Sequence, residues 1–195
     1  MRRSIGRQLG QVGCSARGQS IALLLTFMWL ASFVRPSSAL AQTHIACGQT
    51  LSGNIASVGQ QDVYGFSGVA GEAVVIASVG TSGTLDARAQ LYGPTGTLLG
   101  GNYGNGASGV LTLPTTGTYT VVVADWAVNK TGGYNVNVQF TTGRCGTAIT
   151  CGQTLGGTIG VAQQNSYTFA GTAGEAVVIA SVGTSGTLDA RAQLY

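Results

Sequence analysis

The chain has 195 residues, of which only 8% are charged and 32 are glycine. Its formal net charge of +3 is misleading, because five of its nine basic residues fall within the first 41 positions. Residues 42–195 hold four basic and six acidic side chains, so the sequence lacks the positive footprint on which nucleic-acid binding depends.

Residues 1–41 have the features of a signal peptide. Arginines at the start precede an apolar run at 21–34, which is shorter than a membrane-spanning helix needs. Ala39 and Ala41 supply the small-x-small pattern of a cleavage site, and we place the cut after Ala41. An uncleaved N-terminal anchor is the alternative. We therefore expect a secreted, periplasmic or cell-surface protein with no membrane contact after cleavage.

The rest of the chain is organised around an internal repeat. Residues 70–92 return letter for letter as 173–195, and the similarity extends upstream to Cys47 and Cys151. The period of about a hundred residues far exceeds the ~20–50 of solenoids, so each unit is large enough to form a small domain. We predict one complete repeat over 47–145 and a truncated second copy over 151–195, which holds about four strands.

Four cysteines constrain this arrangement. Cys14 is removed with the leader, Cys47 opens the first repeat and Cys145 closes it. We favour a disulfide between Cys47 and Cys145, because that pairing gives each repeat its own bond. The alternative joins Cys145 to Cys151 across a short linker.

Between these cysteines, short runs rich in valine and threonine alternate with glycine-rich turns. The predicted strands are 51–55, 63–66, 73–79, 87–92, 97–99, 110–113, 118–124 and 134–140. Apolar and polar residues alternate in 87–92 and 134–140, as in strands buried on one face, whereas 73–79 is apolar on both. No helical period is sustained. We predict an all-β fold, an antiparallel jelly-roll-like β-sandwich of about eight strands.

Short motifs follow one another through the repeat in a fixed order. They are Tyr64-Gly65-Phe66, Ala70-Gly71-Glu72, Leu85-Asp86, the turn at 91–96, the segment 113–119 and Gly132-Gly133-Tyr134. This ordered set resembles the bacterial pre-peptidase C-terminal domain, a jelly-roll-like β-sandwich found on secreted proteins. The resemblance implies a non-catalytic accessory module, and some members of that family bind collagen or calcium. The acidic cluster of the calcium-binding members is missing here, because the few carboxylates are scattered.

The composition also argues against an enzyme. The only histidine, His44, is expected in a flexible terminus, where no Ser-His-Asp or Cys-His site can be assembled around it. A zinc site needs several histidine or cysteine ligands, which the sequence does not supply. We therefore expect no metal and no cofactor. Residues 104–109 match the G-x-G-x-x-G pattern, but a strand rather than a helix is predicted after them, so we interpret them as a loop.

Three residues are candidates for binding. Asp86 could be a calcium ligand, although we favour an Asx-type turn or a pair with Arg88. Tyr103 and Trp126 lie in the two longest loops, where aromatic side chains on a rigid sandwich can contact peptide or sugar. The alternative for Trp126 is that it folds back and caps one end of the core.

These observations favour a secreted, non-catalytic β-sandwich module with a binding or spacer role, whose partner is an extracellular protein or polysaccharide. The alternative function is the severed accessory part of a larger secreted peptidase or other hydrolase, and a structural array in a surface layer is a third. Half a sandwich leaves strand edges unpaired, so we expect 151–195 not to be an independent domain. We favour a fragment of a longer array over strand-swapped self-association.

Overall fold

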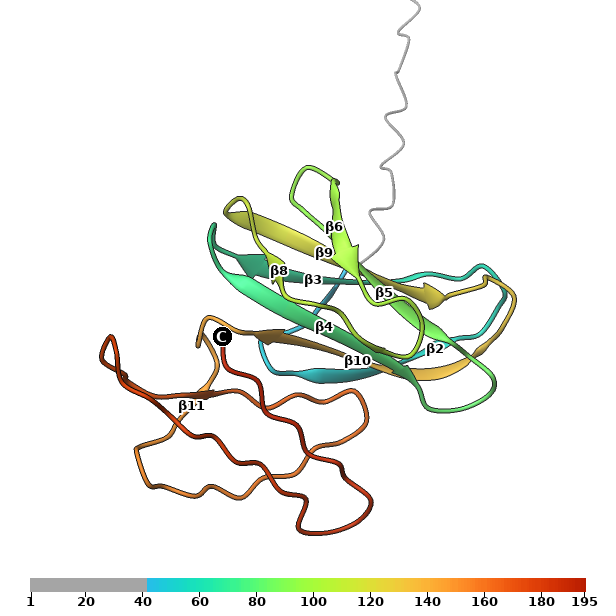
Figure 1. Ribbon diagram of the computed structural model, residues 1–195. Helices are drawn as coiled ribbons and strands as arrows, with labels where there is room; N and C mark the ends of the chain where they lie inside the picture. Colours follow the sequence, from blue (N-terminus) through green and yellow to red (C-terminus); the bar gives the residue numbers. More distant parts are fainter. Residues whose placement is uncertain (1–41) are drawn as a thin grey trace, which may run out of the picture. The chain divides into compact units, whose positions relative to one another are not determined.

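The structure is a computed structural model that describes residues 42–195, so the predicted signal peptide at 1–41 lies outside the described part of the chain. Every regular element within 42–195 is a β-strand. The first repeat contains β1 (Thr43–His44), β2 (Thr50–Ile55), β3 (Asp62–Gly68), β4 (Ala73–Gly80), β5 (Ala87–Tyr92), β6 (Leu98–Gly101), β7 (Gly106–Ala107), β8 (Leu111–Thr112), β9 (Gly117–Asp125) and β10 (Gly132–Phe140) (Figure 1).

These strands form two sheets that enclose one core. One sheet has the order β1-β3-β9-β5-β6, and the other has the order β2-β10-β4-β7, with β8 also paired to β4. All neighbours run antiparallel except β1 and β3, which are parallel. Most neighbours are distant in sequence, as expected for jelly-roll connections. The predicted all-β sandwich is confirmed.

The core follows from the alternation of side chains along the strands. In β5, Ala87, Ala89 and Leu91 are buried while Arg88 and Gln90 are partly exposed, as predicted. In β4, every residue from 74 to 78 is buried, because β4 has neighbours on both sides in its sheet and the other sheet across the core. The core of the sandwich is a single cluster with members from both sheets.

Two expectations about irregular segments are wrong. His44 is not in a flexible terminus: it is exposed in β1, which pairs with β3. The burial of Ile45 and the hydrogen bond from Gln42 Nε2 to the carbonyl oxygen of Tyr64 anchor this segment. The stretch 104–109 is not one loop, because it contains the whole of β7, whose backbone pairs with β4.

A disulfide closes the first repeat. Cys47 and Cys145 are bonded, with their Cα atoms 6.0 Å apart and a sequence separation of 98 residues. Both pack against the edge of the hydrophobic core. This is the pairing that the sequence favours. Cys151, which the alternative pairing would use, is an exposed free thiol.

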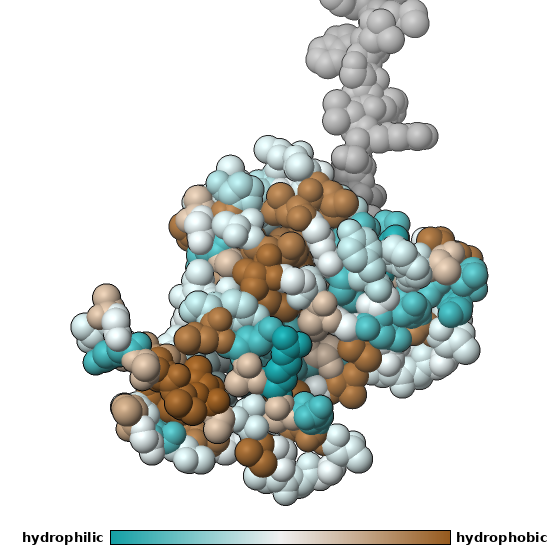
Figure 2. Space-filling view, in the orientation of Figure 1, coloured by the Kyte–Doolittle hydropathy of each residue, from teal (hydrophilic) through white to brown (hydrophobic). Residues whose placement is uncertain are grey.

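The second copy does not form the predicted strands. Within 151–195 the only strand is β12 (Tyr167–Thr168), which pairs in parallel with β11 (Thr147–Ala148). Large apolar side chains here are exposed, among them Val178, Val182 and Leu194. Figure 2 shows a hydrophobic patch over the segment that Figure 1 colours orange to red. The physical reason is that β4 and β5 pair with β10 and β9, and 151–195 contains no counterparts of those strands.

Between residues 42 and 195, the structure contains no helix long and apolar enough to cross a membrane.

Candidate functional site

The two aromatic residues singled out from the sequence lie next to each other. Tyr103 follows β6, and Trp126 directly follows β9. Their ring centroids are 5.4 Å apart, and the planes meet at 85°, the edge-to-face arrangement that the ring quadrupoles favour. Tyr103 is 71% exposed and Trp126 is 44% exposed. Trp126 therefore does not cap the core, as its alternative interpretation required.

A third side chain joins them from β5. The guanidinium carbon of Arg88 lies 5.6 Å from the centre of the Trp126 ring, within the range of a cation–π interaction. Arg88 occupies an outward-facing position of β5 and pairs in register with Ala124, two residues before Trp126. We refer to Arg88, Tyr103 and Trp126 as the aromatic cluster. From the sequence, Arg88 was expected only as a partner of Asp86.

The loop that carries Tyr103 is held by an asparagine on each side of it. Asn102 is buried; its side-chain oxygen accepts from the Ala89 backbone N–H at 2.9 Å, and its side-chain nitrogen donates to Ser78 Oγ at 2.8 Å. The side-chain oxygen of Asn105 accepts from the backbone N–H groups of Gly80 and Ala87 at 2.7 and 3.0 Å. Tyr103 is thus presented from a fixed backbone, which reduces the entropy lost when a ligand binds.

The loop that carries Trp126 is held by Asp125. This buried carboxylate accepts hydrogen bonds from the backbone N–H groups of Asn129 at 2.9 Å, Lys130 at 3.1 Å and Asp86 at 3.1 Å. Burial by itself raises the pKa of Asp125, but the three N–H donors and the positive charge of Lys130 outweigh it. The pKa of Asp125 therefore lies below its ordinary value of 3.8.

Asp86 ties the two loops to each other. Its backbone carbonyl accepts from the Trp126 N–H at 2.8 Å, and its carboxylate accepts from the Asn105 N–H at 2.8 Å. Gly104 sits against this carboxylate: a Cβ on Gly104 would lie 2.8 Å from Asp86 Oδ1. Asp86 is therefore the common support of both halves of the aromatic cluster.

The expected roles of Asp86 need correction. It does not pair with Arg88, since the only ion pair within the described residues joins Arg144 to Glu72. Its carboxylate binds a backbone N–H in a loop 19 residues away rather than in a local Asx-type turn. As for calcium or another metal, residues 42–195 bring together no group of three or more histidine, cysteine, aspartate or glutamate side chains.

The sequence predicts only part of the hydrogen bonding that holds these two loops. The glycine-rich composition around 102–106 and the Asp-Trp pair at 125–126 mark loops, but nothing in them shows which polar side chains turn inward. The G-x-G-x-x-G match at 104–109 contains β7 and is followed by β8, which is a strand, so the helix that a dinucleotide site requires does not follow it.

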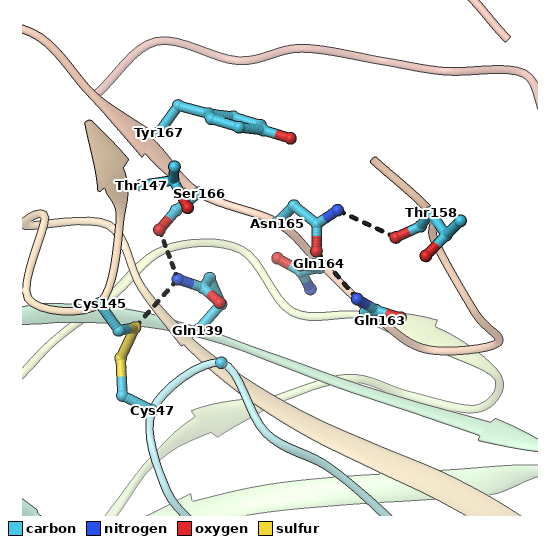
Figure 3. A pocket seen from close by; sticks show the side chains of 11 residues that line it. Cys47, Gln139, Cys145, Thr147, Thr158, Gln163, Gln164, Asn165, Ser166 and Tyr167 are labelled. Carbon is cyan, nitrogen blue, oxygen red and sulfur yellow. Dashed lines mark hydrogen bonds between the residues drawn. A yellow bond between two sulfur atoms is a disulfide. The ribbon is translucent and has the colours of Figure 1, made fainter. Parts of the chain in front are cut away.

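A polar hollow of about 440 Å³ lies elsewhere, beside the disulfide (Figure 3). Its lining residues are Cys47, Gly48, Gln139, Cys145, Thr147, Thr158, Gln163, Gln164, Asn165, Ser166 and Tyr167. Gln139 Nε2 donates to Ser166 Oγ at 2.6 Å and to Cys145 Sγ at 3.2 Å. None of these residues is a carboxylate, histidine or lysine, so the lining offers no pair for acid–base catalysis.

The role assigned to Asp125 can be tested by the substitution Asp125→Asn. Near neutral pH we expect it to lower the free energy of unfolding by about 1–3 kcal/mol, because the charge-assisted hydrogen bonds weaken. The pKa of Asp125 is lower in the folded state than its ordinary value of 3.8. The contribution of its negative charge to the free energy of unfolding is therefore complete at pH values above 3.8, and it is lost as the pH falls through the folded-state pKa.

Urea denaturation of the wild type and the variant across the acid range measures this effect. The difference between the two proteins should shrink as the pH falls, and the other carboxylates cancel in the comparison. A difference that stays constant into strongly acidic solution would contradict the lowered pKa.

Comparison with known proteins gives similarities over parts of the chain. The RtxA repeat family matches residues 70–86 and 173–189, which lie within the two identical stretches. The match therefore marks the repeat unit and covers the strand β4 together with Asp86. No curated protein matches the chain.

Among solved structures, the pre-peptidase C-terminal domain of a collagenase from Bacillus anthracis is 16% identical and covers 50% of this chain and 94% of its own, with a TM-score of 0.42. PliG, a periplasmic inhibitor of g-type lysozyme, is similar at 18% identity from Aeromonas hydrophila (51% of this chain, 95% of its own, TM-score 0.42). The PliG from Salmonella Typhimurium is 24% identical (51% of this chain, 97% of its own, TM-score 0.40).

Proposed function

We propose that this chain is a secreted, non-catalytic β-sandwich module that binds an extracellular macromolecule through the aromatic cluster. The observation that carries the proposal is the meeting of Tyr103 and Trp126, exposed side chains from separate loops. Exposed aromatic groups grouped on one surface are typical of binding sites, since each offers a large apolar area with few rotatable bonds.

Two further observations support the proposal. Both loops are fixed by buried polar side chains, Asn102 and Asp125, so the rings are positioned before any ligand arrives. Export is supported by the leader pattern at 1–41 and by the Cys47–Cys145 disulfide, since such bonds persist in oxidising compartments.

The ordered motifs that resemble the pre-peptidase C-terminal domain favour a more specific function for the module. In that version the module is an accessory part of a secreted hydrolase and holds the enzyme near its substrate. The gene sequence beyond the codon for Tyr195 distinguishes the two: a catalytic domain supports the accessory role, and further Cys-Gly-Gln-Thr repeats support a binding or spacer array.

The binding function is tested by comparing wild type with Tyr103→Ala and Trp126→Ala in co-sedimentation with insoluble polysaccharides and fibrous proteins. We expect each variant to bind about tenfold or more weakly than the wild type, because a central aromatic contact contributes about 2 kcal/mol or more. Both variants should keep the urea midpoint of the wild type, because neither side chain belongs to the core.

Tyr195→Ala is the matched control, because Tyr195 is also an exposed tyrosine but lies outside the cluster. It should bind like the wild type. Equal binding by all four proteins overturns the proposed site, and a wild type that binds nothing in the panel supports the spacer role instead.

A further inference from the structure

The charge around the aromatic cluster is unlike that of residues 42–195 as a whole. Arg88 forms no ion pair among the described residues, and its Nε is buried without a hydrogen-bond partner. Lys130 is exposed in the loop that begins at Trp126 and also forms no ion pair within this part of the chain. Two cations that form no ion pair among the described residues therefore belong to the cluster and to the loop that begins at Trp126, although acidic residues outnumber basic ones over 42–195.

The carboxylates nearby do not cancel this charge toward a ligand. Asp125 is buried, and its two oxygens accept three backbone N–H groups. Asp86 is partly buried, and one of its oxygens accepts the Asn105 N–H. Both acids are engaged in holding the loops. Of the other side chains at this site, Lys130, the aromatic rings and Asn129 are exposed, and Arg88 is partly exposed.

From this arrangement we propose that the aromatic cluster binds an acidic polysaccharide, whose uronate carboxylate is held by Arg88 while its sugar ring packs on Tyr103 or Trp126. This inference rests on the proposed binding function and names its ligand class. The C–H groups of a sugar ring carry partial positive charge and pack on the negative face of an aromatic ring. A planar guanidinium forms the short, paired hydrogen bonds that best match a carboxylate.

A polysaccharide fits the site better than a peptide for two reasons. The cluster lies beside the turns that follow β6 and β9. Arg88 comes from β5, an inner strand with β9 and β6 on its two sides, so an added peptide strand could pair only with the edge strand β6 and not beside Arg88. The neighbouring uncharged side chain, Asn129, is an exposed amide, which can donate to and accept from sugar hydroxyls.

Binding of the mature chain to soluble polygalacturonate, to its fully methyl-esterified form and to poly-glutamate tests the proposal, with titration calorimetry as the readout. We expect polygalacturonate to bind about tenfold more tightly than the ester, which keeps the sugar rings but lacks the charge. The preference should weaken as ionic strength rises. Arg88→Gln should abolish the preference, and Trp126→Ala should weaken binding of both polymers.

Arg144→Gln is the matched control, because Arg144 is the arginine of the ion pair with Glu72 and lies outside the cluster. It should keep the preference of the wild type. Equal affinity for polygalacturonate and its ester, or an undiminished preference in Arg88→Gln, overturns the acidic ligand and leaves the binding function standing. Poly-glutamate that binds as tightly as polygalacturonate overturns the polysaccharide. Binding to none of these polymers and to nothing in the insoluble panel overturns both proposals.

Discussion

The double substitution Cys47→Ser and Cys145→Ser is expected to lower the free energy of unfolding by about 4–5 kcal/mol. The bond closes a loop with a sequence separation of 98 residues, and removing it restores the conformational freedom that this closure takes from the unfolded chain. A loss of that size is comparable with the whole stability of many small domains. Urea denaturation of the chain without residues 1–41, followed by circular dichroism, measures it.

Cys151→Ser is the matched control for this experiment. Cys151 is exposed and free, so its replacement keeps the disulfide and should change the free energy of unfolding by no more than about 0.5 kcal/mol. The control also removes the thiol that could exchange with the bond during unfolding. A double variant as stable as the control would contradict the stabilising role assigned to the bond.

The sequence predicted most strands of the first repeat because their burial is periodic. The alternation in β5 comes directly from one face being buried, and the apolar run of β4 comes from its central place. In β10 the expected half-burial is wrong, because the polar residues Asn137 and Gln139 are buried as well as the apolar ones. The two-residue strands β1 and β7 carry no such pattern. They form because the edges of β3 and β4 accept any backbone with matching geometry, which depends on the assembled sheets.

The sequence predicted two members of the aromatic cluster but not that they lie next to each other. Tyr103 and Trp126 stood out as aromatic side chains in loops. Their proximity and the addition of Arg88 depend on β5 pairing with both β6 and β9, a register that no local pattern reveals. The hydrogen bonds of Asp86 and Asn105 that hold the loops could not be predicted for the same reason. Whether a polar side chain points inward depends on where its hydrogen-bond partner lies in the folded chain.

The identical stretches 70–92 and 173–195 show how the same residues behave beside different neighbouring strands. The first forms β4 and β5, and the second forms no strand. Val75 is 5% exposed, whereas its counterpart Val178 is 96% exposed. The same residues therefore become strands only where β9 and β10 are present to pair with them, as expected when strand preference reflects packing on neighbours. That 151–195 is not an independent domain stays a prediction for limited proteolysis.

Phe66→Ala is expected to lower the free energy of unfolding by about 3–5 kcal/mol, because it empties the middle of the sandwich. Phe66 comes from β3 in one sheet and is 3% exposed. Its ring stacks on that of Tyr119 in the same sheet, with centroids 5.5 Å apart, and meets Phe140 of the other sheet edge-on at 5.6 Å. The substitution removes both contacts and leaves a cavity that these rings are too firmly packed to fill.

The second copy supplies a matched control for this substitution. Phe169 occupies the position that corresponds to Phe66 but is 39% exposed. Phe169→Ala should therefore change the free energy of unfolding of the chain without residues 1–41 by only about 0.5 kcal/mol. Both variants are measured by urea denaturation with the slope of the transition compared, so that a change in the unfolded state is detected. An equal cost at both positions would mean that 151–195 acquires a packed core of its own in solution, with Phe169 in the place that Phe66 holds in the first repeat.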